Sequence, residues 1–346
     1  MTKKKKSSFY IVVVLGLILL FTVFQFFGPV THKTEKEFLL VKTGTTLGQL
    51  QQQLVGEKFL SGLTWFKLAS KAVGFTNVKP GRYKVPAGTS IVNLVRRLKN
   101  GSQTPVEFIV TKLRTKEGLA GRMGKSFEYD SLQAIRFLTN SDSLRVYGLD
   151  SNTVMAAVLP MNYEVKWNTR PRVLFDKFYA AYKNFWNDTR LKKAEAQGLT
   201  PLQVVTLASI VEEETNVPAD KPKIARVYMN RLIKGMPLQA DPTVKFALKD
   251  FGLKRILFQH LSVASPYNTY KNKGLPPGPI CTPQLATVEA VLDAPQADYI
   301  YFVANSNFDG TSVFTSSYQE HMKNAKMYQQ ALDAQIRKRD SLNALK

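Results

Sequence analysis

Residues 200–216 read TPLQVVTLASIVEEETN, an apolar run that begins with helix-starting residues and ends in three consecutive glutamates. Thr200 is a suitable hydroxyl N-cap, Pro201 fits the first helical position, and Gln203 completes a capping box. The segment is therefore predicted to be a helix that runs into the glutamates and stops before Pro218. Adjacent carboxylates on a helix point in different directions, so each glutamate should have its own environment.

The helical phase separates the three glutamates. Thr206, Ser209 and Glu213 fall opposite the apolar stripe of the helix, so Glu213 is predicted to be the solvated member. Glu212 and Glu214 flank the stripe on its two sides. A carboxyl held against apolar side chains has a raised pKa, which suits a general acid for glycosidic bonds. Geometry favours Glu214 only slightly. Three consecutive glutamates usually form just the charged, solvated end of a helix, with no catalytic role.

The N-terminus has the pattern of a membrane anchor. Lys3–Lys6 precede an uncharged run from Phe9 to Phe27, which is long enough to cross the core of a bilayer. Basic residues before the run place residues 1–8 in the cytoplasm and everything after residue 27 outside. A cleaved signal peptide would have a shorter apolar region followed by small residues, so an uncleaved single-pass anchor is predicted.

The composition is that of a folded protein with a large positive charge. Of 346 residues 44% are apolar, and the formal net charge is +22. Inside a cell this charge would suggest nucleic acid, but an exported domain is better suited to anionic lipid head groups or an anionic wall polymer. Cys281 is the single cysteine, and the three histidines lack ligand spacing. No metal or other cofactor is expected, and carboxylates remain as the candidates for acid–base chemistry.

An internal repeat follows the polar linker at residues 28–37. Phe38–Val41 is a predicted strand, and Gly44 and Gly88 each begin the pattern G-T-[ST]-[IL]-x-x-L-x-x-x-L. Each copy combines a turn glycine, a hydroxyl N-cap and an apolar stripe, which predicts a helix after a strand. Residues 38–105 are therefore expected to form a compact α+β module that resembles the LysM-like domains of wall-glycan binding. A spacer without a ligand is an equal alternative.

The rest of the chain divides at residue 200, where helical periodicity becomes stronger. Residues 106–199 are predicted to be a connecting region, residues 200–335 a second domain, and residues 336–346 a polar tail. The second domain carries amide and hydroxyl residues in loops stiffened by Pro and Gly. Such loops suit a cleft for a hydroxyl-rich polymer.

Segments of the second domain carry a family resemblance: LASIVEEET (207–215), MNRL (229–232), MPLQADPTV (236–244), SPYNTY (265–270) and GLPPGPI (274–280). In this order they are similar to the endolytic murein transglycosylases, the YceG-like or MltG family, and the likeness covers nearly the whole chain. The resemblance implies a mixed α+β, lysozyme-like catalytic domain. It also implies cleavage of the β-1,4 bond between N-acetylmuramic acid (MurNAc) and N-acetylglucosamine (GlcNAc) in nascent peptidoglycan.

The resemblance also assigns residues. The family's catalytic glutamate directly precedes Thr in I-V-E-x-E-T, which makes Glu214 the general acid and then the base, with Glu212 in a supporting position. The expected product is a strand ending in 1,6-anhydro-MurNAc, formed without a cofactor. At positions 160–163 the family tends to carry Asp where this chain has Met161, so the role of that Asp is fulfilled differently here, or by Asn162 or Glu164. The family's cleft motifs place substrate-binding residues at Asn230, Gln239, Asp241, Thr243, Tyr267, Asn268 and Tyr270.

The implied partners are peptidoglycan strands, the membrane and peptidoglycan synthases (penicillin-binding proteins), and nucleic acid is not among them. The implied location is the bacterial cytoplasmic (inner) membrane, with the catalytic domain outside the cytoplasm. Two alternatives remain. One is a hydrolytic muramidase that pairs Glu214 with a second acid such as Asp241. The other is a non-catalytic, membrane-tethered protein that binds wall glycan.

Overall fold

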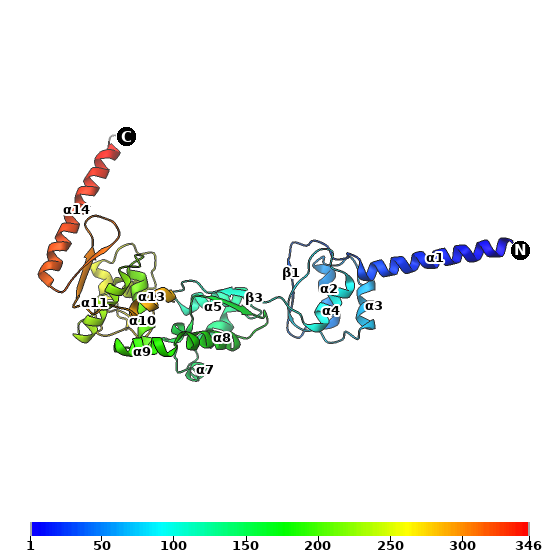
Figure 1. Ribbon diagram of the computed structural model, residues 1–346, viewed down its shortest axis with the longest axis horizontal. Coiled ribbons are helices and arrows are strands. Elements are labelled where there is room, and N and C mark those ends of the chain that lie inside the picture. Colours follow the sequence, from blue (N-terminus) through cyan, green and yellow to red (C-terminus); the bar gives the residue numbers. More distant parts are fainter. Residues whose placement is uncertain (1, 345–346) are drawn as a thin grey trace. The chain divides into compact units, whose positions relative to one another are not determined.

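The computed structural model describes residues 2–344 (Figure 1). These residues form two compact units. The first unit runs to Phe108 and also includes residues 124–130 and 163–170. The second unit comprises residues 109–123 and 131–162 and everything described from Pro171 onward. The chain therefore passes between the units several times.

The elements up to Ser126 are α1 Thr2–Phe27, β1 Phe38–Val41, α2 Leu47–Gly56, α3 Thr64–Ala72, β2 Gly81–Lys84, α4 Ile91–Asn100, β3 Val106–Ile109 and α5 Lys116–Ser126. The following elements, with η marking 3₁₀ helices, are α6 Ser131–Thr139, α7 Ser141–Arg145, η1 Val154–Ala157, β4 Asn162–Val165, α8 Pro171–Phe185, α9 Asp188–Ala196 and α10 Pro201–Glu214. The last elements are α11 Lys221–Ile233, α12 Asp241–Leu248, η2 Phe258–Ser262, α13 Leu285–Leu292, β5 Tyr301–Ala304, β6 Ser312–Thr315 and α14 Tyr318–Ala344.

Helix α1 contains the predicted anchor. Within it Phe9–Phe27 is long and apolar enough to cross a membrane, and this stretch is not buried in the structure. Near its C-terminal end, Phe21 and Phe26 pack edge to face against Trp65 of α3, with ring centroids 6.1 and 5.4 Å apart. The end of α1 therefore packs on α3 through aromatic contacts.

The repeat predicted from the sequence forms the core of the first unit. Strands β1 and β2 pair antiparallel, with Phe38 opposite Lys84, and α2, α3 and α4 lie beside them (Figure 1). Thr46 caps α2 in a capping box and Ser90 caps α4, as predicted. The preceding turns need glycine, because Gly44 and Gly88 have φ of 83° and 81°. The predicted strands and helices of this region are confirmed.

The second unit is built around α10. The predicted capping box at Thr200 is confirmed, and the helix ends at Glu214. It packs against α9, α11, α12 and α13 (Figure 1), and every residue from Val204 to Glu212 is buried. The prediction that Thr206 and Ser209 lie on an exposed side is therefore wrong, because helices surround α10 and it has no solvated face along this stretch.

Ser209 shows how the surrounding loops bind to α10. Its hydroxyl donates to the Thr206 carbonyl at 2.7 Å and accepts the Ile280 N–H at 2.9 Å. The Cys281 sulfur lies 3.4 Å from the Ser209 carbonyl oxygen. Cys281 is almost fully buried, and this burial raises the pKa of its thiol. The loop before α13 is thereby fixed along the helix.

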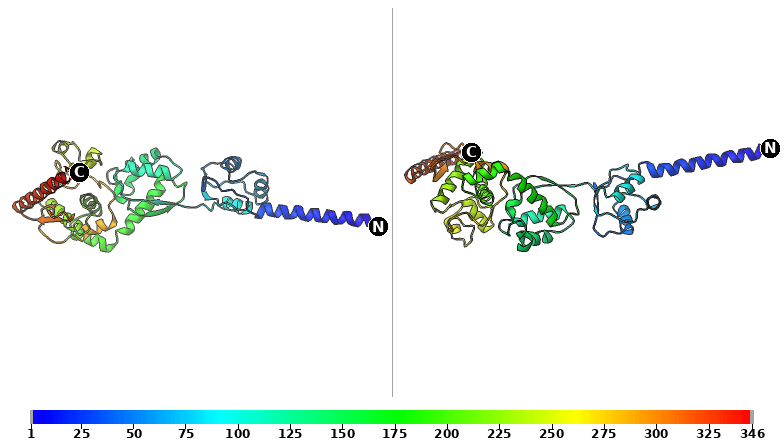
Figure 2. Two further views of the ribbon diagram at one scale, coloured as in Figure 1. Left: turned by 90° about the horizontal axis from the view of Figure 1, so that it is seen from above. Right: turned by 60° about the horizontal axis from the view of Figure 1, so that its bottom comes forward.

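The strands form two-stranded sheets among the described residues, with orders β1–β2, β3–β4 and β5–β6. In the last of these, Tyr301 lies opposite Thr315 in antiparallel register. Helix α14, red in Figures 1 and 2, packs on β5 and β6. Helices dominate the core and the sheets are small, which confirms a mixed α+β fold.

Candidate active site

Glu214, the last residue of α10, is bound by a tyrosine from the next helix. The hydroxyl of Tyr228 on α11 donates to Glu214 Oε1 at 2.6 Å, and Tyr228 is almost fully buried. Burial raises the pKa of Glu214 to about 7, because the carboxylate loses water, and the hydrogen bond from Tyr228 offsets only part of this. A carboxyl with this pKa can both give and take a proton near neutral pH, as general acid–base chemistry requires.

Charged groups of both signs surround Glu214. Asp241, the first residue of α12, further disfavours the carboxylate, whereas Lys245 and Arg231 favour it. Arg231 is fixed by donating to the carbonyls of Ile300 and Leu238, at 2.9 and 2.7 Å. The protonated and ionised forms of Glu214 therefore each have a nearby stabilising charge.

Two of the predicted substrate residues meet beside Glu214. The Tyr270 hydroxyl donates to Asp241 Oδ1 at 2.6 Å. Burial raises the pKa of Tyr270, and the negative charges of Asp241 and Glu214 raise it further. Tyr270 therefore stays a neutral hydrogen-bond donor, and the pair brings α12 and the SPYNTY loop to the end of α10.

Glu212 lies inside the second unit. Its Oε2 accepts hydrogen bonds from Lys221 Nζ, at 2.9 Å, and from the Thr287 hydroxyl. Lys221 Nζ also donates to Thr287 at 2.7 Å. Glu212 is 6% exposed, so the pair is buried. Because its side chain is paired with Lys221 and Thr287, Glu212 stabilises the junction of α10, α11 and α13.

Glu213 is held in ion pairs with Lys112 and Arg114, and the prediction that it is the solvated glutamate is wrong. Its oxygens accept from Arg114 Nε and Nη2 at 3.1 and 3.0 Å and from Lys112 Nζ at 2.9 Å. Its side chain is only 15% exposed, because the segment before α5 covers this face of α10. Burial raises the pKa of Glu213, but the hydrogen bonds from Arg114 and Lys112 outweigh it and hold the pKa below its usual value.

Three other predicted residues have their polar groups occupied within the chain. Asn230 Nδ2 donates to the carbonyls of Ala297 and Tyr299, both at 2.8 Å, and so fixes the approach to β5. Asn268 is fully buried, and its Nδ2 donates to two loop carbonyls at 2.9 Å. Thr243 is also fully buried, and its hydroxyl donates to the Ala240 carbonyl at 2.6 Å. The structure places these side chains as supports of the loops around Glu214.

Gln239 and Tyr267 are more accessible. Gln239 has an exposed side chain and a left-handed backbone, with φ of 54°, and its N–H donates to the Thr269 carbonyl at 3.1 Å. Tyr267 packs on Phe246, with ring centroids 4.6 Å apart, and burial raises its pKa to about 12. Asn162 and Glu164, which stand near the family's missing Asp, are exposed residues of β4.

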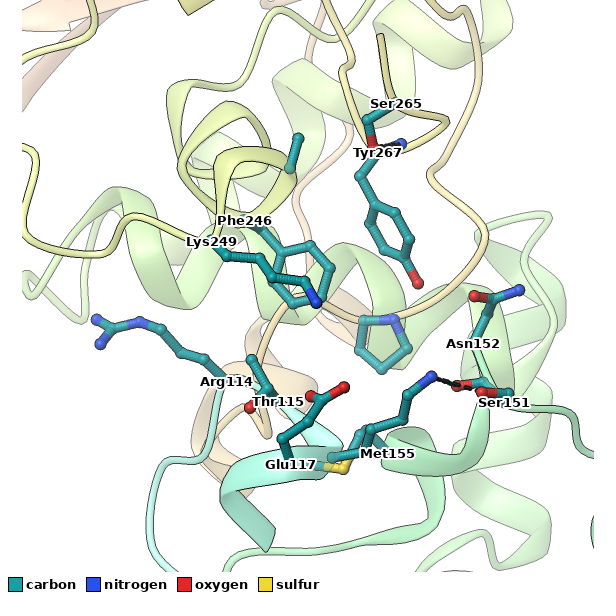
Figure 3. A pocket seen from close by; sticks show the side chains of 13 residues that line it. Arg114, Thr115, Glu117, Ser151, Asn152, Met155, Phe246, Lys249, Ser265 and Tyr267 are labelled. Carbon is teal, nitrogen blue, oxygen red and sulfur yellow. Dashed lines mark hydrogen bonds between the residues drawn. The ribbon is translucent and has the colours of Figure 1, made fainter. Parts of the chain in front are cut away.

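A cleft of about 190 Å³ opens beside α12 (Figure 3). Its walls come from the start of α5, the loop before η1, the end of α12 and the SPYNTY loop. In Figure 3 the Glu117 carboxylate, the Lys249 ammonium and the Tyr267 hydroxyl are directed into it. Gly278 permits one wall to form, because a Cβ there would lie 2.1 Å from the Asn152 carbonyl oxygen.

Glu214 lines neither this cleft nor a second cavity of about 40 Å³. This cavity shares Arg114 and Phe246 with the cleft. It is also lined by Glu213, Pro242 and Lys245, and the charge of Lys245 acts on Glu214. Helix α12 therefore forms part of both regions, with its first turns near Glu214 and its last turn in the cleft.

Sequence reasoning missed several residues of this site. Tyr228, Arg231 and Lys245 all act on Glu214 but belong to other helices. One signal was available: Tyr228, just before the MNRL motif, and Arg231, within it, are three residues apart, so they share a face of α11. Lys249 and Glu117 have no such signal. Within the part of the chain that the structure describes, no three His, Cys, Asp or Glu residues gather into a potential metal site.

Together, the fold and this site define a class of protein: an α+β chain with a long apolar N-terminal helix and one helix-terminal carboxyl whose pKa burial raises to about 7. The chain belongs to the YceG-like family, whose model matches residues 39–327.

Named relatives and a solved structure agree with this assignment. The endolytic murein transglycosylase of Bacillus subtilis (strain 168) is 29% identical over 306 residues, covering 83% of each chain. That of Streptococcus pneumoniae serotype 2 (strain D39) is 28% identical and covers 75% of this chain, which spans 52% of the streptococcal protein. A crystal structure of a YceG-like protein from Listeria monocytogenes matches 84% of this chain and 99% of its own, with 25% identity and a TM-score of 0.55.

Proposed function

We propose that this chain is an endolytic peptidoglycan lytic transglycosylase and that Glu214 is its catalytic acid and base. The observation that carries the proposal is a carboxyl with a pKa of about 7, bound by one tyrosine and influenced by the charges of one anion and two cations. The names of the Bacillus and Streptococcus relatives support the reaction class. The bond, the product and the role of Glu214 belong to the proposal.

In the proposed first step, protonated Glu214 gives its proton to the glycosidic oxygen between MurNAc C1 and GlcNAc. The C1–O bond breaks, and GlcNAc leaves with a free hydroxyl. Burial and the neighbouring Asp241 favour the protonated form that this step needs. Tyr228 holds one carboxyl oxygen, so the other can face the bond.

In the second step, the Glu214 carboxylate removes the proton from the C6 hydroxyl of the same MurNAc, whose oxygen bonds to C1 and closes the 1,6-anhydro ring. The carboxyl is then protonated again and ready for another cycle. Arg231 and Lys245 stabilise the transient carboxylate, as does the hydrogen bond from Tyr228. One carboxyl serves both steps because no water molecule has to be activated.

A hydrolytic muramidase is the second candidate, and Asp241 favours it. Its charge acts directly on Glu214, and a second carboxylate is what glycoside hydrolases need to activate water or form a covalent intermediate. Against this reading, Asp241 Oδ1 already accepts the Tyr270 hydroxyl. We therefore assign Asp241 and Tyr270 to holding the sugar and tuning Glu214.

Digestion of purified glycan strands by the detergent-solubilised full chain, read by mass spectrometry, tests this proposal. Anhydro ends are expected, and reducing ends would establish the muramidase instead. Glu214→Gln should abolish cleavage, whereas Glu213→Gln, which changes the neighbouring clamped glutamate, should retain it. Binding of strands without cleavage by either wild type or variant would support the non-catalytic tether.

We also propose that α1 is a single-pass anchor in the bacterial cytoplasmic membrane, with its N-terminus in the cytoplasm. Residues 38–105 would be a LysM-like module that binds glycan, residues 106–199 a connecting region, and residues 200–335 a lysozyme-like catalytic domain. Peptidoglycan synthases would then be neighbours in the same membrane. Binding of glycan strands to the chain and to a variant lacking residues 38–105 tests the module, and equal binding would make it a spacer.

A further inference from the structure

Two oppositely charged side chains that line the cleft beside α12 have no ion-pair partner among the described residues. Lys249 and Glu117 are exposed, and neither has an ion pair or side-chain hydrogen bond with another described residue. Both point into the cleft from different walls (Figure 3). The other two cations at its edge are already engaged. Arg114 pairs with Glu213, and Lys116 Nζ donates to Ser151 Oγ and O at 2.5 and 2.9 Å.

The backbone at Lys249 gives a second, independent indication. Lys249 follows the last turn of α12 with φ of 55° and ψ of 25°, a left-handed cap that glycine adopts most easily. A lysine in this conformation is sterically strained, because its Cβ lies close to the backbone. Strained residues of this kind concentrate at binding sites, where the side chain has a use that offsets the strain. At this cap the lysine side chain points into the cleft (Figure 3).

The remaining lining suits a peptide. Asn152 and the Tyr267 hydroxyl can bond to amide groups, while Met155, Phe246 and Pro279 supply apolar contacts for short side chains. The free cation fits a carboxylate and the free anion fits an ammonium group. A short zwitterionic peptide matches all of these features, whereas a peptide-free MurNAc, which offers only its lactyl carboxylate, would leave Glu117 unpaired.

From these observations we infer that the cleft binds the peptide stem that MurNAc carries in peptidoglycan, with Lys249 on a stem carboxylate and Glu117 on the amino group of its diamino acid. This inference rests on the proposed function. It makes the enzyme selective for strands that still carry their peptides, and it assigns the cleft to a part of the substrate that the reaction itself leaves unchanged.

The distances along α12 agree with this arrangement. Lys245 acts on Glu214, and Lys249 lies four residues further on, or about 6 Å along the helix axis. The stem begins on the same MurNAc whose C1–O bond would be cleaved. Two or three extended peptide residues reach about 7–10 Å, which is longer than the rise from Lys245 to Lys249.

The test compares two substrates: glycan strands with intact stem peptides, and the same strands after an amidase has removed them. For the full-length enzyme, kcat/KM should be about tenfold higher on stem-bearing strands, because the binding free energies of two partly exposed ionic contacts add up to about this factor. Lys249→Ala should lower this ratio about threefold, mainly through KM, and Lys249→Ala combined with Glu117→Gln should bring it close to one. Lys234→Ala, at an exposed lysine that follows α11, should leave the ratio unchanged.

Lys249→Gly separates binding from folding. Glycine relieves the left-handed cap, so this variant should melt at a higher temperature than wild type while its substrate ratio falls as in Lys249→Ala. Equal kcat/KM of the wild type on both substrates, or a ratio that the cleft variants do not change, overturns the inference and leaves the proposed function standing. Cleavage of neither substrate overturns both.

Discussion

Replacing Tyr228 with Phe removes the hydrogen bond to Glu214 and should shift the pH dependence of catalysis. The bond is 2.6 Å long and lowers the pKa of Glu214, which burial nevertheless raises to about 7. A hydrogen bond to a charged group contributes about 1.5–3 kcal/mol, and 1.36 kcal/mol corresponds to one pKa unit. Because the protonated carboxyl also gains from the hydroxyl, the lower end applies, and the pKa should rise by about one unit.

The assay is a pH profile of kcat/KM, followed by counting anhydro ends. Activity falls at high pH as Glu214 loses the proton it must donate, so this limb should move upward by about one unit in Tyr228→Phe. The plateau should also drop, since the carboxyl is no longer oriented. Tyr147→Phe is the matched control, because it removes a 2.5 Å hydrogen bond from a tyrosine to another carboxylate, Asp176. A limb that stays in place or moves to lower pH would refute the reasoning.

Three further changes test the fold around the site. A pKa raised from 4.5 to about 7 makes wild-type stability fall as the pH rises through this range, so Glu214→Gln should be more stable by about 1–3 kcal/mol at pH 8 and equal at pH 4 in urea unfolding. Lys221→Met leaves the buried Glu212 carboxylate unpaired and should cost about 3–5 kcal/mol, whereas adding Glu212→Leu should recover most of it, and urea unfolding of both variants checks this. Gly278→Ala forces a Cβ to within 2.1 Å of the Asn152 oxygen and should lower the melting temperature by roughly 4–8 °C; an unchanged value would mean that the loop yields freely.

Features set by neighbouring residues were predictable from the sequence. The caps at Thr46, Ser90 and Thr200 and the turn at Gly44 depend on a few adjacent positions, and the structure has each of them. The start of α10 could therefore be predicted to the residue. The α+β class follows from the same local patterns.

Features set by distant segments were not predictable in this way. Helical phase alone made Glu213 solvated, but Arg114, 99 positions earlier in the chain, covers it. Sequence periodicity likewise could not predict the contact between Tyr228 and Glu214, because this contact depends on how α11 packs on α10. Helical phase identifies the apolar side of a helix, but α10 is buried on every side from Val204 to Glu212, and its glutamates differ in their partners.

The burial of Cys281 also has a practical consequence for spectroscopy. It is the only cysteine of the chain, it is 1% exposed, and burial keeps its thiol protonated. A thiol-reactive dye or spin label will therefore not react with the native protein, and it will label only cysteines introduced at the surface. A pair of such labels, one in each unit, would report the distance between the units in a lipid nanodisc without any need to remove a native residue.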